Sequence, residues 1–134
     1  MQRFNMFTLI HKALRAMLYD TSLTIQQTSF NDPLEAETAL EKIEDVLYIF
    51  EKHAHHEDHM VFPAIEDKEP GLADSFEKEH VTDLRLSNRM KNLLNIYRNL
   101  MFADERIEAG SAITKAFIEF MIFNLEHMGK EEML

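Results

Sequence analysis

Helix-breaking residues are scarce in this chain, and the helical pattern is interrupted at three short stretches. Among 134 residues there are only 3 glycines and 3 prolines. An all-β fold needs turns far more often than that, so a few long helices are favoured. In the first stretch, Asp32 is a good helix N-cap and Pro33 a good first helical residue. With further breaks near 67–71 and 102–104, we expect helices over 4–28, 33–66, 71–100 and 105–134.

Apolar residues recur at helical spacing in each segment. Four amphipathic helices with short connections predict an all-α, up-down-up-down antiparallel four-helix bundle, formed as a single domain over 1–134. Asp104 is a candidate cap for the last helix, and Pro63 is expected to kink or end the second. The stripe expected in the second segment comprises Val46, Ile49, Phe50, Met60, Val61 and Ala64, and that of the fourth comprises Ile113, Phe117, Phe120, Phe123 and Leu134.

Charge and cysteine content exclude several classes of function. The net charge is −10, and no cluster of lysine or arginine is present, which disfavours nucleic acid and anionic membranes as partners. Without cysteine there can be no disulfide, no thiolate catalysis and no cysteine-ligated metal. The stretch 116–123 is too short to span a bilayer and contains Glu119. Residues 1–5 lead into an amphipathic pattern, so we expect no signal peptide and a cytoplasmic protein.

Two histidines are followed by a glutamate four residues later: His53 by Glu57, and His127 by Glu131. This spacing places both side chains of a pair on one helix face. An isolated pair of this kind is more often an exposed ion pair than a metal site. Here both pairs lie on predicted apolar seams, where an ionisable group needs a partner or a metal. The seams are Ile49-His53-Glu57-Met60 and Phe120-Asn124-His127-Glu131-Leu134.

The lone histidines His11 and His80 also lie on apolar stripes, and each half of the chain repeats one pattern. A lone histidine is followed by a turn and then by a His-x-x-x-Glu pair. Antiparallel helices would bring these residues to one level of the bundle, because each lies at a similar distance from the intervening turn. The pattern therefore predicts a binuclear metal site with approximate two-fold symmetry. Its predicted ligands are His11, His53, Glu57, His80, His127 and Glu131.

Four stretches resemble the hemerythrin-like, or HHE cation-binding, family. They are Ile10 to Arg15, His53 to Pro63, Glu79-His80, and His127 to Glu132, and the resemblance covers essentially the whole chain. It implies two iron ions joined by an oxo or hydroxo bridge and by the carboxylates of Glu57 and Glu131. His11 and His53 would bind one iron, and His80 and His127 the other. Zinc or manganese would accept the same imidazole and carboxylate donors.

One departure from the family bears on function. Hemerythrins that carry dioxygen have a fifth histidine one turn from the third-helix ligand, but Phe76 and Leu84 occupy the positions four residues from His80. Glu77 and His56 are the candidates to replace it. Without a replacement, each metal keeps an open position, which suits sensing or peroxide and nitric oxide chemistry better than oxygen carriage.

Four residues beside the predicted ligands have a smaller expected part in the site. Glu132 could act as the bridging carboxylate in place of its neighbour Glu131. His55 and His59 flank the seam of the second helix at an angle, so we expect them on the surface. Asp58 is also expected to face solvent.

Three functions fit these residues. The first is a non-haem di-iron protein that binds or senses dioxygen, peroxide or nitric oxide. The second is iron handling or iron–sulfur repair with labile iron, and the third is a helical regulatory module without metal. The predicted partner is a small diatomic or peroxide ligand, with no nucleic acid and no membrane. Catalysis and a homodimer are left open.

Overall fold

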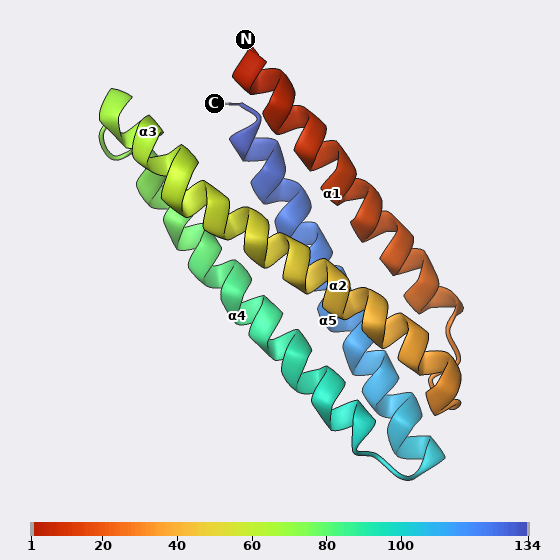
Figure 1. Cartoon of the computed structure of the whole chain (residues 1–134). Helices are drawn as coiled ribbons and strands as arrows, with labels where there is room; N and C mark the ends of the chain where they lie inside the picture. The colour runs from red at the N-terminus through yellow and green to blue at the C-terminus, as the bar shows by residue number, and fades with distance from the viewer. Residues whose placement is uncertain (1, 134) are drawn as a thin grey trace.

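The computed structural model describes residues 2–133, with the side chains of 8–71 and 73–133. Within this range the chain forms four helical rods and no strand, which confirms the predicted all-helical bundle. Figure 1 shows the start of α1, the end of α5 and the α3–α4 connection at one end of the molecule, and the other two connections at the opposite end. The rods are α1 (Gln2–Gln27), α2 (Pro33–His56) continued by the π turn η1 (Glu57–Val61) and by α3 (Phe62–Lys68), α4 (Leu72–Arg98), and α5 (Ala103–Glu131).

Helix boundaries fall within three residues of those expected, and one of the two predicted caps is present. The side chain of Asp32 accepts a hydrogen bond from the backbone N–H of Leu34 at 3.0 Å, and Pro33 is the first residue of α2. The prediction that Asp104 caps the last helix is wrong. The helix begins at Ala103, after Phe102 in an extended conformation, so Asp104 lies inside the first turn. There its charge still favours the helix N-terminus.

The second rod changes its winding between Glu57 and Val61. This segment is a π turn, in which the N–H of Phe62 donates to the carbonyl of Glu57, five residues back. Pro63 does not end the rod, because α3 continues to Lys68. A π turn holds one residue more than an α turn, and the buried face shifts accordingly.

The apolar stripe predicted for this rod is therefore wrong in part. Val46 and Phe50 are buried as expected, but Met60 is 64% exposed and Ala64 is exposed. Phe62 and Ile65 take their place in the interior because of the extra residue in the turn. Ile49 is 38% exposed because it lies beside the buried face and not on it.

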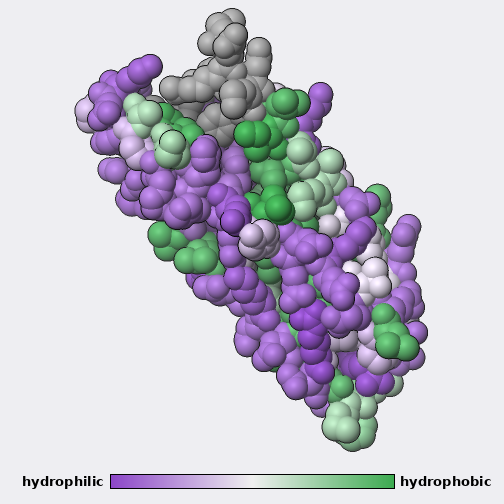
Figure 2. Space-filling model, in the orientation of Figure 1, coloured by the Kyte–Doolittle hydropathy of each residue, from purple (hydrophilic) through white to green (hydrophobic). Residues whose placement is uncertain are grey.

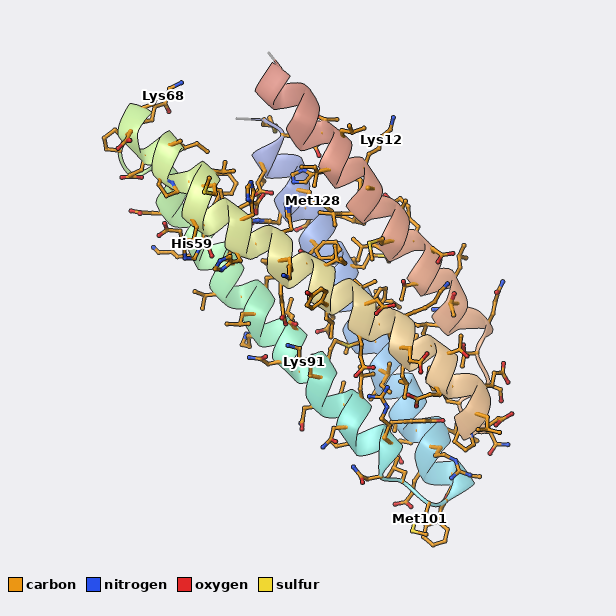
Figure 3. The ribbon with its side chains drawn as sticks, viewed as in Figure 1. Lys12, His59, Lys68, Lys91, Met101 and Met128 are labelled. Atoms are coloured by element: carbon orange, nitrogen blue, oxygen red, sulfur yellow. The ribbon has the colours of Figure 1, made fainter. Side chains whose placement is uncertain are left out.

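The main hydrophobic core fills the bundle away from the termini and receives side chains from all four rods. A second cluster, formed by Phe62, Ile65, Ala73 and Phe76, joins α3 to α4 at the end of the bundle that holds the start of α1 and the end of α5. Figure 2 shows a mainly hydrophilic outer face with apolar residues gathered in strips and at the lower tip. In Figure 3, Lys12, His59 and Lys91 point outward, whereas the buried Met128 lies between the rods. No helix in the described range has the length and apolarity that crossing a membrane requires.

Candidate metal centre

The six residues predicted as ligands come together at the end of the bundle that holds the start of α1 and the end of α5. Their donor atoms form two groups, each with all its donor atoms within 4.8 Å of one another. We call these groups the α1–α2 position and the α4–α5 position, after the rods that carry the histidines. The α1–α2 position comprises His11, His53, Glu57 and Glu131, and the α4–α5 position comprises His80, His127, Glu57 and Glu131.

Both glutamates belong to both groups, and each divides its two oxygens between them. Glu57 places Oε1 at 2.9 Å from Nε2 of His80 and Oε2 at 2.9 Å from Nε2 of His53. Glu131 places Oε1 at 3.3 Å from Nε2 of His11 and Oε2 at 3.2 Å from Nε2 of His127. Each carboxylate thus has the arrangement that is needed to bridge two cations.

Three further carboxylates hold the outer nitrogen of a histidine ring. Nδ1 of His11 donates to Glu132 at 2.8 Å, Nδ1 of His80 donates to Asp58 at 2.9 Å, and Nδ1 of His127 donates to Glu79 at 2.9 Å. We call Asp58, Glu79 and Glu132 the backing carboxylates. An ionised carboxylate can only accept, so the proton resides on Nδ1 in each of these rings and Nε2 presents a lone pair to the centre.

Sequence patterns did not predict the backing carboxylates. Asp58 was expected to be solvated, yet it binds His80. Glu132 does not take the bridging place, because it lies outside both groups and pairs with Arg15 at 2.7 Å. A signal was available, because each backing carboxylate directly adjoins a predicted ligand in the sequence. Which ring it would reach could not be read from that signal, because the ring belongs to another helix.

The interior of the centre fits a metal and is poorly satisfied without one. The Nε2 atoms of His11 and His53 lie 3.2 Å apart, and those of His80 and His127 lie 3.0 Å apart. His80 and His127 both keep their proton on Nδ1, so their Nε2 lone pairs face each other and repel unless a cation or a proton lies between them. In addition, Oε2 of Glu57 and both carboxylate oxygens of Glu131 are buried and make no aligned hydrogen bond among the described residues. Imidazole nitrogen and carboxylate oxygen are donors that iron, manganese and zinc accept.

In the metal-free chain, protons on the histidines supply positive charge to the centre. Burial lowers the pKa of His11, but Glu131, Glu57 and Glu132 outweigh it and raise that pKa to about 9. Burial likewise lowers the pKa of His127, but the carboxylates of Glu131, Glu57 and Glu79 outweigh it and raise that pKa to about 10. Although burial raises the pKa of Glu57, its four histidine neighbours hold it well below its usual range. The centre therefore attracts positive charge strongly, and metal ions must compete with protons for it.

Aromatic rings enclose the α4–α5 position. The ring of Phe62 lies 5.2 Å from that of His80, between centroids, and the rings of Phe76 and Phe123 lie 5.9 Å and 6.1 Å from that of His127. Phe76 occupies one of the two positions, four residues from His80, at which a fifth histidine would lie, and it is buried in this cover. The other, Leu84, is 52% exposed. Such a cover limits the access of water to the metal position.

A cavity of about 230 Å³ adjoins His80 between α2 and α4. Asp83 lines it and is 8% exposed, and Nδ2 of Asn124 donates to its Oδ1 at 2.7 Å. Burial raises the pKa of Asp83. The residues that line the cavity are Glu51, Ala54, His55, Asp58, His80, Asp83, Leu84 and Ser87.

Comparison with known protein families agrees with this centre. The model of the hemerythrin HHE cation-binding domain matches residues 3–134. The chain belongs to this family. No curated protein and no solved structure matches it. The HHE domain binds metal cations, and the cluster of histidine and glutamate described above is a site that could hold them.

The two weaker ligand candidates are not brought to the centre of this HHE domain. His56 and Glu77 are both exposed and lie outside both groups. His55 and His59 are also exposed, with ring centroids 4.0 Å apart, and Nδ1 of His59 contacts the carbonyl of His55 at 2.9 Å. Ligation by the six converging residues stays a prediction.

Proposed function

We propose that this HHE domain holds two iron ions and binds a small ligand, either dioxygen, peroxide or nitric oxide, at the binuclear centre. The observation that carries the proposal is the division of Glu57 and Glu131 between the two groups. Each glutamate presents one oxygen to an imidazole of the α1–α2 position and the other to an imidazole of the α4–α5 position. The up-down-up-down order of the rods, supported by the alternating connections in Figure 1, is part of this proposal.

Ligand type and number favour iron with open coordination positions. Each group offers two imidazole nitrogens and two shared carboxylates. Two histidines and one carboxylate are the donor set that non-haem ferrous sites use when they leave positions open for oxygen chemistry. Iron would supply the electrons for such chemistry. The chain's own residues would bind and orient the ions, and the phenylalanine cover would exclude water.

The size of the surroundings favours a small ligand over a large substrate. The cavity next to His80 measures about 230 Å³, below the range of pockets that bury drug-sized molecules. Its lining is rich in ionisable side chains, and Asp83 and Asp58 lie beside His80 within it. A diatomic molecule or peroxide fits there, and we infer that this cavity is its route to the centre.

Elemental analysis and absorption spectroscopy test the proposal. The protein would be reconstituted anaerobically with ferrous ion, oxidised, and measured with and without azide. We expect two irons per chain and oxo-bridged di-iron bands that shift when azide binds. Absence of iron, or one tightly held zinc ion, would reject the redox function and leave a structural metal bundle or a regulatory module.

Labile iron is the second candidate, and the exposure of one histidine favours it. The side chain of His53 is 14% exposed, whereas that of His11 is fully buried. An iron ion bound beside an accessible ligand is easier to remove. Fast transfer of half the iron to a weak chelator would support iron handling, and iron that stays bound for hours would exclude it.

The third candidate, a helical regulatory module without metal, is tested by His53→Ala. In such a module, this substitution would leave stability independent of added metal.

A further inference from the structure

The two halves of the chain are related by a pseudo-two-fold pattern that extends to two backing carboxylates. Asp58 follows Glu57 in the first half, and Glu132 follows Glu131 in the second. Each holds Nδ1 of the lone histidine from the opposite half: Asp58 that of His80, at 2.9 Å, and Glu132 that of His11, at 2.8 Å. The contact of Asp58 with His80 and that of Glu132 with His11 are therefore equivalent under the pseudo-two-fold relation of the two halves.

The third backing carboxylate breaks the pattern. Glu79 precedes the lone histidine of the second half and holds Nδ1 of His127 at 2.9 Å. The matching residue of the first half precedes His11 and is Ile10, which cannot accept a hydrogen bond. By the same symmetry, Ile10 would have served His53. Among the side chains that the structure describes, none accepts from Nδ1 of that ring.

The most exposed histidine of the centre, His53, belongs to the α1–α2 position, whose other histidine, His11, is fully buried. The four residues of the α4–α5 position are all buried, whereas the α1–α2 position includes the half-buried His53. The side chain of His53 is 14% exposed, compared with 8% for His80 and 5% for His127. A carboxylate on the outer nitrogen fixes the tautomer and orientation of a ligating ring and strengthens it as a donor.

We propose that the two metal positions are unequal in affinity, and that the difference between Glu79 and Ile10 is the main cause. The α4–α5 position binds tightly and fills first. The α1–α2 position binds more loosely and is the one that exchanges. This inference rests on the proposed two-metal centre, and it assigns Glu79 as a positioning residue that acts on the metal through His127.

Cobalt(II) titration of the metal-free protein provides the first test. Calorimetry and visible absorption would follow the binding of the ion, and crystals grown with one equivalent would locate it by anomalous scattering. We expect two steps of different affinity, with the first ion beside His80 and His127. Two steps of equal affinity, or a first ion beside His11 and His53, would overturn the inference and leave the two-metal function intact. Fewer than two ions per chain would overturn both.

Two substitutions test the cause in opposite directions. Glu79→Gln keeps the size of the side chain and should weaken the first step by about 10-fold to 100-fold, the usual effect of losing such a partner. Ile10→Glu would supply the missing acceptor at a 43% exposed position and should strengthen the second step. Glu126→Gln, which removes an exposed charge beside His127, is the matched control and should change neither step. If Glu79→Gln leaves the first step unchanged while the fold is intact by circular dichroism, Glu79 is not the cause.

Discussion

The two ends of the bundle differ in where their charged side chains lie: on the surface at one end and in the interior at the other. At the far end, which holds the connections 28–32 and 99–102, the interior is apolar and includes Leu40 and Leu94, both at most 1% exposed. Charges there lie on the surface, where Arg98 pairs with Glu37 at 2.7 Å and with Glu44 at 2.8 Å. At the metal end, carboxylates and imidazoles are buried in the interior beside the apolar cluster that joins α3 to α4.

This difference separates two tasks. The far end gains stability from apolar burial, at about 25 cal/mol for each Å² of apolar surface removed from water. The metal end buries six ionisable side chains, which is costly unless they are paired or bind a cation. We expect that the far end holds the four rods together and that order at the metal end depends on a bound cation.

Removal of metal should have the largest effect. A bound ion stabilises the folded protein by about 4 kcal/mol when its free concentration is about 1,000 times its dissociation constant. Chelation should therefore lower the thermal midpoint strongly and should speed hydrogen exchange in residues 124–131 much more than in 110–117. Thermal unfolding and exchange measured by mass spectrometry check this. An equal loss of protection at both ends would show that the ends are not independent.

Leu94→Ala should lower stability by about 2–5 kcal/mol, because it leaves a cavity in the apolar far end. The loss should be the same with and without metal. Chemical denaturation in both states measures it. A loss that changes with metal would contradict the separation of the two ends.

The metal-free protein should lose stability as pH rises above neutrality. The pKa of His11 rises from 6.5 to about 9 and that of His127 to about 10, so protonation of these rings favours the folded state. Their contribution is complete below pH 6.5 and disappears as pH passes through 9 to 10. For His11 it is on the order of 3 kcal/mol. Metal-loaded protein should lack this decline, since binding is favoured by deprotonated rings. Thermal midpoints across this pH range, with and without metal, test both parts.

Asp32→Ala should have the smallest effect, about 1 kcal/mol, through loss of the α2 N-cap. Asp32→Asn keeps an acceptor and serves as the control. Because the cap lies at the far end, metal affinity should be unaltered. Equilibrium unfolding and cobalt titration of both variants check the prediction, and a change in metal affinity would contradict it.

Helical spacing and breakers were enough to predict the four rods, and the His-x-x-x-Glu pairs led to the six residues that converge. The π turn could not be predicted, because nothing in the composition of 57–61 distinguishes it from α-helix. It determines that Phe62 is buried and Met60 exposed. The backing carboxylates were missed because acidic residues are common on exposed helix faces. The choice of Asp58 as the partner of His80 depends on the relative rotation of two helices, which sequence spacing does not specify.

The π turn has a consequence for how the centre can be modified. His53 lies before the π turn and Glu57 is its first residue, while Phe62 and Ile65 follow it. The spacing of the two metal-facing residues is therefore independent of the register that orients the aromatic cover. A substitution of Phe62 would therefore alter the aromatic cover over the ring of His80 without changing the spacing of His53 and Glu57.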